Sequence, residues 1–184
     1  MKKHQNSPLN WLKNFPFKKI TDHKYSRGKL IIVGGQKEML GATILSAESA
    51  LRTGVGSVKI ICNKETLPIY SIKFPSLLKK EINKFKEFKK FVLKNKECTF
   101  LIGPGAGSNK TTKQKVVFLL KNIKNVILDA DALTSFKKDL NKFYKLLDKD
   151  KIITPHIREF KSIFPNLQKI KTNELKIIKA SKII

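Results

Sequence analysis

The sequence predicts an α/β protein in which a mostly parallel sheet is covered by helices on both faces. Short apolar runs, such as residues 29–33 (KLIIV) and 99–102 (TFLI), alternate along the chain with longer segments of helical periodicity. Each run is continuously apolar, which is typical of strands that are buried on both faces. Strands that alternate with helices in this way predict three layers, with the sheet between two layers of helices.

Five strands are expected, each bounded by glycine, proline or polar residues. They cover residues 29–33, 57–61, 99–102, 125–128 and 151–154. Helices are expected between and after them, at residues 41–53, 64–70, 79–95, 113–122, 137–147, 158–164 and 172–183. Gly54 is a typical residue to end helix 41–53, because glycine readily adopts the left-handed conformation that follows many helices.

The expected helix at 79–95 has the most regular pattern. Its apolar side chains are Ile82, Phe85, Phe88, Phe91 and Val92, with Lys and Glu between them. A spacing of three to four residues places such side chains on one face of a helix. We interpret this stripe as core rather than as a contact surface for a cofactor.

Length and composition indicate one domain. A chain of 184 residues with 41% hydrophobic residues can bury one substantial core. We expect a basic arm at residues 1–22 and the domain at residues 23–184. No apolar run reaches the roughly 18 residues of a membrane-spanning helix, and the N-terminus lacks the apolar region of a secretory signal. Cys62 and Cys98, the only cysteines, stand alone, so neither a zinc site nor a disulfide is expected and a cytoplasmic location is predicted.

The net charge of +25 raises the question of a polyanionic partner. Only three of the 39 basic residues are Arg (Arg27, Arg52 and Arg158), and the lysines are spread over the whole chain. Nucleic-acid interfaces favour the guanidinium group for its fork and its stacking, so this pattern argues against nucleic acid. Compositional bias is the favoured explanation, and an anionic small-molecule substrate would suit the charge equally well.

Polar or glycine-rich turns follow four of the expected strands. They are Gly34-Gly35, residues 103–107 (GPGAG), residues 129–131 (DAD) and residues 154–156 (TPH). The carboxyl ends of parallel strands lie along one edge of a sheet, and ligands bind in the crevice outside that edge. The four turns are therefore expected to form a ligand site together.

Each turn has its own chemistry, and each also has a structural explanation. GPGAG would let backbone N–H groups approach a phosphate closely, although glycine-rich turns are often only turns. Ala42 lies in the opening turn of a helix, where free N–H groups would also face the crevice. Asp129 and Asp131 could hold a cation, accept a hydrogen bond from a ribose hydroxyl or cap the following helix. His156 could be a hydrogen-bonding group, a proton carrier or simply the next surface residue after a strand.

Several familiar catalytic patterns are absent from the sequence. No Ser/His/Asp or Cys/His arrangement of a nucleophile is apparent, and the Lys-Ser/Thr pair of a Walker motif is missing. GPGAG also lacks the GxGxxG spacing of dinucleotide-binding dehydrogenases, which argues against that class.

Five stretches in and around these turns resemble one family. They are HKYSRGKLIIVGG (23–35), MLGATILSAESALRTGVGSVKI (39–60), LIGPGAG (101–107), VILDADAL (126–133) and ITPHIREF (153–160). In order and spacing they are similar to the ADP- or ATP-dependent NAD(P)H-hydrate dehydratases, whose fold is ribokinase-like. The resemblance covers roughly residues 23 to 165. It implies a repair reaction in which hydrated NADH or NADPH is phosphorylated by a nucleotide and then loses water to regenerate the cofactor.

The resemblance also implies roles for individual residues. Ala42, Gly105, Gly107 and His156 match the family positions that line the site for the hydrated cofactor. Asp129 and Asp131 match positions near the phosphates and any metal. The implied co-substrate is ADP or ATP, with ADP expected, together with Mg²⁺. A homo-oligomer or an epimerase partner is a further expectation.

One departure limits what the resemblance implies. The family continues with a strand ending in Lys-Gly and with a Gly-Thr-Gly-Asp block that carries the catalytic aspartate, whereas no glycine follows Gly107 here. We therefore expect no catalytic residue within residues 1–184, an incomplete sheet on the C-terminal side, and little activity and a tendency to aggregate in this chain alone. A fragment of a ribokinase-like small-molecule kinase and a non-enzymatic basic protein that retains the fold are the alternatives.

Overall fold

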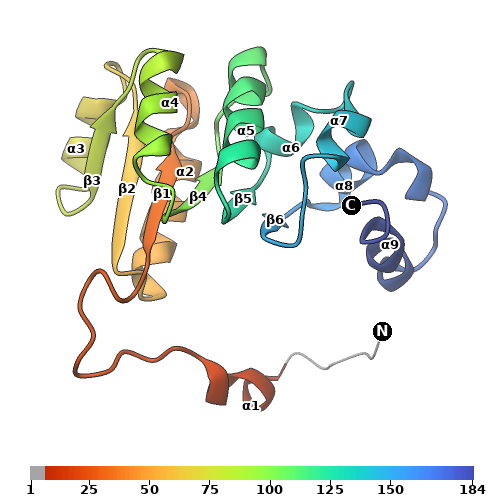
Figure 1. Ribbon diagram of the computed structural model, residues 1–184, viewed down its shortest axis with the longest axis horizontal. Helices are drawn as coiled ribbons and strands as arrows, with labels where there is room; N and C mark the ends of the chain where they lie inside the picture. The colour runs from red at the N-terminus through yellow and green to blue at the C-terminus, as the bar shows by residue number, and fades with distance from the viewer. Residues whose placement is uncertain (1–6) are drawn as a thin grey trace.

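The computed structural model describes residues 7–184, and at its centre is a six-stranded parallel sheet (Figure 1). The strands are β1 (Lys29–Val33), β2 (Ser57–Cys62), β3 (Leu78–Glu81), β4 (Thr99–Ile102), β5 (Val126–Leu128) and β6 (Lys151–Ile153). Their order across the sheet is β3-β2-β1-β4-β5-β6, and every neighbouring pair is parallel. The predicted parallel α/β fold is confirmed.

Helices cover the sheet on both faces, as the sequence predicts. The α-helices are α1 (Pro8–Trp11), α2 (Leu40–Arg52), α3 (Leu67–Lys73), α4 (Phe85–Leu93), α5 (Lys110–Asn122), α6 (Asp131–Thr134), α7 (Leu140–Tyr144), α8 (Ile157–Ile163) and α9 (Asn173–Ala180). Short 3-10 helices occur at Leu12–Asn14, Lys37–Met39 and Pro165–Leu167. In Figure 1, α4 and α5 lie in front of the sheet and α2 lies behind it.

Two hydrophobic clusters correspond to the two faces of the sheet. The pleat of β1 sends Ile31 and Val33 into the larger cluster and Ile32 into the smaller one, because successive side chains of a strand point to opposite faces. The larger cluster is completed by α4 to α9, and the smaller one by α2 and α3. The aromatic stripe of α4 is core, as predicted, since Phe88 and Val92 are fully buried.

Coverage of the second face ends before the last strands. Ile127 of β5 is half-buried on that face, and Ile152 of β6 has 56% of its surface exposed. Within residues 7–184, β6 also pairs with β5 alone. This side of the sheet therefore presents an open apolar surface and an edge strand.

The expectation of one helix at 79–95 was wrong. Residues Leu78–Glu81 instead form β3, which pairs with β2, and the helix begins only at Phe85. Residues 82–84 separate the two elements, and the backbone N–H groups of Asn83 and Lys84 donate to the Glu87 carboxylate at the start of α4. A polar sequence such as LKKE forms a strand only when a neighbouring strand, here β2, is available to pair with it.

The expected helix at 137–147 was also wrong in extent. Within this range only α7 (Leu140–Tyr144) is an α-helix, and a separate short helix, α6, precedes the range at Asp131–Thr134. The expected basic arm at 1–22 begins in residues that lie outside the described part of the chain. From residue 7 onward, its segment runs below the sheet in Figure 1, at the end where β1 begins.

Candidate active-site edge

The turns after β1 and β4 contact each other directly. The backbone N–H of Gln36 donates to the carbonyl of Gly105 over 2.7 Å. The Thr43 hydroxyl, on α2, accepts from the N–H of Gly35 at 2.8 Å and donates to the carbonyl of Pro104 at 3.2 Å. Thr43 is fully buried, so these hydrogen bonds fix the start of α2 against the GPGAG turn.

The turns after β4, β5 and β6 are joined by two carboxylates. Asp131 accepts a hydrogen bond from the backbone N–H of Gly107 at 2.8 Å. Asp129 accepts from the Thr154 hydroxyl, also at 2.8 Å. Together with the Gln36–Gly105 bond and the bonds around Thr43, these contacts form what we call the turn network, which links the ends of β1, β4, β5 and β6.

Close packing of the backbone explains why glycine stands at two positions of GPGAG. Gly103 has φ of +134° and a Cβ there would collide with the carbonyl oxygen of Asp129. Gly105 has φ of +69° and a Cβ there would collide with the carbonyl oxygen of Met39, the residue before α2. Both conformations are unfavourable for side-chain-bearing residues. GPGAG is therefore a turn whose shape requires glycine, whatever it binds.

All six residues predicted for the site lie in the turn network or within two residues of it. Gly105, Gly107, Asp129 and Asp131 make network contacts themselves. Ala42 is exposed in the first turn of α2, next to Thr43. His156 follows Thr154 by two residues, and 60% of its side chain is exposed. The structure thus brings the residues to one edge of the sheet.

The position of His156 also gives it a structural role that the sequence analysis did not include. Its Nδ1 accepts from the backbone N–H of Arg158 at 3.0 Å, so it is the N-cap of α8. Its own backbone N–H donates to Glu159 at 2.9 Å, and its Nε2 lies 3.1 Å from the other Glu159 oxygen. The Glu three residues after a capping residue is the pattern that could have revealed this.

A hollow of about 430 Å³ lies beside the GPGAG turn. Gly34, Gly35 and Ala106 line it from the turns, and Lys110 and Lys115 line it from α5. None of its lining residues is acidic. Burial lowers the pKa of Lys115, whose Nζ lies over the Phe88 ring at 5.6 Å from the centroid. Such a hollow suits an anionic group.

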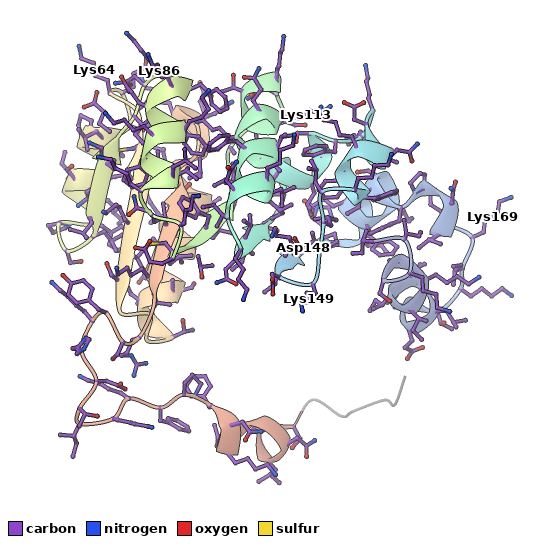
Figure 2. The ribbon with its side chains drawn as sticks, in the orientation of Figure 1. Lys64, Lys86, Lys113, Asp148, Lys149 and Lys169 are labelled. Atoms are coloured by element: carbon purple, nitrogen blue, oxygen red, sulfur yellow. The ribbon has the colours of Figure 1, made fainter. Side chains whose placement is uncertain are left out.

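Sequence reasoning did not single out Lys110 or Lys115, because lysine is abundant everywhere in this chain. Lys64, Lys86 and Lys169 project outward from separate elements in Figure 2, as solvated surface lysines do. Only the fold shows that Lys110 and Lys115 line a hollow beside GPGAG.

The described residues lack other features of a reactive centre. Within residues 7–184, no group of three or more His, Cys, Asp or Glu residues is placed to hold a metal ion. Burial raises the pKa of the Cys62 and Cys98 thiols to about 11, so neither is a thiolate nucleophile near neutral pH. None of the helices in this part of the chain is both long and apolar enough to cross a membrane.

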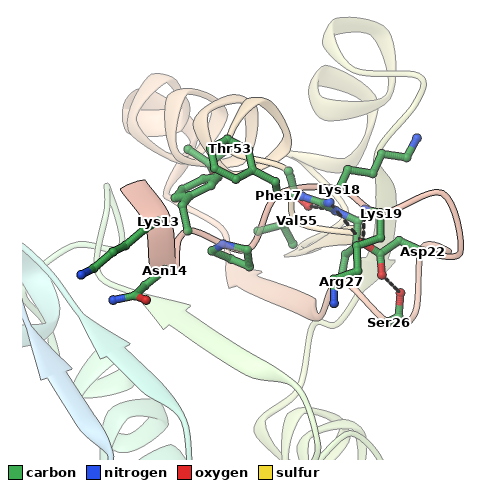
Figure 3. Close-up of a pocket in the computed structure, with 13 residues that line it drawn as sticks. Lys13, Asn14, Phe17, Lys18, Lys19, Asp22, Ser26, Arg27, Thr53 and Val55 are labelled. Carbon is green, nitrogen blue, oxygen red and sulfur yellow. Dashed lines mark hydrogen bonds and ion pairs between the residues drawn. The ribbon is translucent and has the colours of Figure 1, made fainter. Parts of the chain in front are cut away.

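A larger hollow, of about 700 Å³, lies at the other end of the strands, where β1 and β2 begin (Figure 3). It is formed by residues 13–19 together with Arg27 and the turn before β2. Arg27 donates from Nε to the carbonyl of Gly54 over 2.6 Å and lies 3.7 Å from Asp22. These contacts hold the N-terminal segment against the domain. None of the six residues predicted for the site lines either hollow, but only the 430 Å³ hollow is lined by a residue of the GPGAG turn, Ala106.

Comparison with known proteins gives the family. The model of the NAD(P)H-hydrate dehydratase family matches residues 30–182. The bifunctional NAD(P)H-hydrate repair enzyme Nnr of Dictyoglomus turgidum is 36% identical over 151 residues, which are 77% of this chain and 29% of that protein. The ADP-dependent (S)-NAD(P)H-hydrate dehydratase of Staphylococcus aureus is 29% identical, over 82% of this chain and 54% of that protein.

Solved structures agree with this assignment. The ADP/ATP-dependent NAD(P)H-hydrate dehydratase of Bacillus subtilis, co-crystallized with ATP/Mg²⁺, superposes with a TM-score of 0.63 and 26% identity, over 91% of this chain and 56% of that one. A ribokinase-like superfamily protein of Enterococcus faecalis has a TM-score of 0.74 at 21% identity, over 89% of this chain and 58% of that one, and shows the shared fold. This chain spans only 29% to 58% of the length of these four proteins. The resemblance seen in the sequence is confirmed, and the chain belongs to the NAD(P)H-hydrate dehydratase family.

Proposed function

We propose that residues 23–184 provide the substrate-binding edge of a nucleotide-dependent dehydratase that restores hydrated NADH or NADPH, with residues 1–22 as a basic arm outside this domain. The observation that carries the proposal is the turn network, which holds the family-matched residues Gly105 and Gly107 in one constrained arrangement. Membership of the family supplies the reaction: the hydroxyl of the hydrate is phosphorylated, and the phosphate then leaves as the double bond of the dihydronicotinamide ring is restored.

Within this edge, the proposal gives each region a binding role. GPGAG and the first turn of α2, with Ala42, form the wall that the hydrated nicotinamide contacts. The hollow beside Lys110 and Lys115 receives phosphate groups of the dinucleotide, because it combines positive charge with no acidic lining residue. His156 forms the far wall, with its exposed ring held by Glu159.

The co-substrate in this proposal is ADP or ATP with Mg²⁺. Support comes from relatives named as ADP-dependent and ATP-dependent dehydratases, and from the Bacillus subtilis structure obtained with ATP/Mg²⁺. Asp129 and Asp131 do not fit a magnesium site by themselves, because each has one oxygen engaged in the turn network and no third ligand joins them among the described residues. We assign no catalytic residue and no metal ligand within residues 7–184.

We also propose a cellular location for the reaction and a companion activity. A cytoplasmic location suits an enzyme that repairs NAD(P)H. Relatives named as bifunctional repair enzymes support a second activity acting beside this one, for which an epimerase partner or a homo-oligomer is our suggestion. A small-molecule kinase has only the shared fold in its favour.

Calorimetric titration of the chain with hydrated NADPH tests the proposal. Binding is expected, and the double variant Lys110→Gln/Lys115→Gln is expected to lose affinity about tenfold, equivalent to about 1.4 kcal/mol. A matched variant, Lys64→Gln/Lys86→Gln, removes two lysines outside the hollow and should bind as the unsubstituted chain does. Absence of binding, or an equal loss in both double variants, would contradict the proposal.

A further inference from the structure

Asp131 is placed to control the shape of the GPGAG turn. It follows β5, whereas GPGAG follows the neighbouring strand β4, and its Oδ2 accepts from the N–H of Gly107 over 2.8 Å. Both residues are half-buried. This hydrogen bond ties the last residue of GPGAG to the turn of another strand.

The conformation at Gly107 shows why such a tie matters. Gly107 has φ of +77°, and a Cβ there would collide with the side-chain amide of Gln36 from the β1 turn. With this left-handed conformation at Gly107 the chain continues into α5, while the N–H of Gly107 donates to Asp131 in the β5 turn. A buried or half-buried N–H without an acceptor is unfavourable, so the partner carboxylate favours this shape of the turn over others.

Two electrostatic roles for Asp131 fit the structure less well than the hydrogen bond to Gly107 does. As a ligand for Mg²⁺ it would need companions, and residues 7–184 contain no cluster of three candidate ligands. As a free negative charge beside a phosphate site it would repel the phosphate. Accepting one hydrogen bond from the glycine turn explains its position without either role.

We infer that Asp131 is a positioning residue that fixes the substrate-binding turn by accepting the Gly107 hydrogen bond, and that its negative charge is not needed for this. The inference rests on the proposed function, since it concerns how that site is held in shape. An acceptor of the same size without charge should therefore replace it. Asn provides that acceptor through its side-chain oxygen, and Ala does not.

The test compares Asp131→Asn with Asp131→Ala in the full chain. In Asp131→Ala, the exchange rate of the Gly107 amide measured by NMR should rise at least about tenfold, and the affinity for hydrated NADPH should fall about tenfold. In Asp131→Asn, both quantities should stay within about threefold of the unsubstituted chain, with or without Mg²⁺. Asp139→Ala, which removes a surface carboxylate paired with Lys113, is the control and should leave both unchanged.

The outcomes separate this inference from the function on which it rests. Equal losses in Asp131→Asn and Asp131→Ala would overturn the inference, because they would show that charge is required. Unchanged exchange and affinity in Asp131→Ala would overturn it as well. Failure of the unsubstituted chain to bind hydrated NADPH would instead contradict the proposed function, while the exchange rates would still decide whether Asp131 holds the turn.

Discussion

The two ends of the candidate site are built differently. At the β1–β4 end, Gly103 and Gly105 are buried and the main chains of neighbouring turns leave no room for a side chain. At the β6 end, Thr154 and His156 are exposed and are held by hydrogen bonds that their side chains make. One end is therefore fixed by close packing, and the other by replaceable contacts. Substitutions should have severe effects at the first end and graded effects at the second.

The strands that lead to these ends show the same contrast. Ile32 of β1 is fully buried between two neighbouring strands, whereas Ile152 of β6, with the same side chain, is 56% exposed on the last strand of the described sheet. Burial here is a property of position in the sheet rather than of residue type. The open face beside Ile152 is an accessible apolar part of the sheet.

The largest expected effect is that of Gly103→Ala, at the packed end. Left-handed strain of roughly 1–3 kcal/mol adds to a main-chain collision worth roughly 1–3 kcal/mol. We expect the free energy of unfolding in urea to fall by about 2–6 kcal/mol, summing these two contributions. A loss below about 0.5 kcal/mol, the range of ordinary surface changes, would contradict the close packing described for this turn.

The next effect compares the two isoleucines directly. Ile32→Ala should lower the free energy of unfolding by about 2–5 kcal/mol, because it leaves a cavity in the core. Ile152→Ala should change it by less than about 1 kcal/mol, because its side chain already contacts solvent. Chemical denaturation of both variants measures the difference. Similar losses would mean that the face beside β6 is covered in solution.

A smaller effect is expected at the replaceable end, at His156. His156→Ala removes the N-cap of α8 and should cost about 1 kcal/mol, whereas His156→Asn keeps a capping acceptor and should cost only a few tenths. Both variants lack the ring, so both should bind hydrated NADPH more weakly if the ring lines the site. Thermal unfolding and calorimetry separate the two roles. Unchanged affinity for hydrated NADPH in His156→Asn would show that His156 serves only as a helix cap.

Much of the fold could be predicted because buried parallel strands are continuously apolar. The expected bounds of β1 and β4 match the structure residue for residue. Strand β3 was missed since its LKKE sequence has no apolar run, and only pairing with β2 makes it a strand. The pattern of α4 was correct, but its start was not, because Glu87 and the residues before it set that boundary.

The candidate site, like the fold, could be predicted only in part. Chain order and strand ends predicted that GPGAG, DAD and TPH would lie at one edge, because topology alone places them there. The partners of Asp129 and Asp131 could not be predicted, since they depend on contacts between turns some 24 or 25 residues apart in the chain. The lysines of the hollow were hidden by the high lysine content, and the cap formed by His156 was overlooked although Glu159 marks it.

The central claim is that hydrated NAD(P)H binds at the edge formed by the turn network. Titrating hydrated NADPH into the isotopically labelled chain, while following every backbone amide by NMR, tests this directly. The account predicts the largest shifts at Gly105, Gly107 and Lys110, with little change at Arg27 and Gly54 in the opposite hollow. Shifts concentrated at Arg27 and Gly54, or no shifts at saturating ligand, would contradict it.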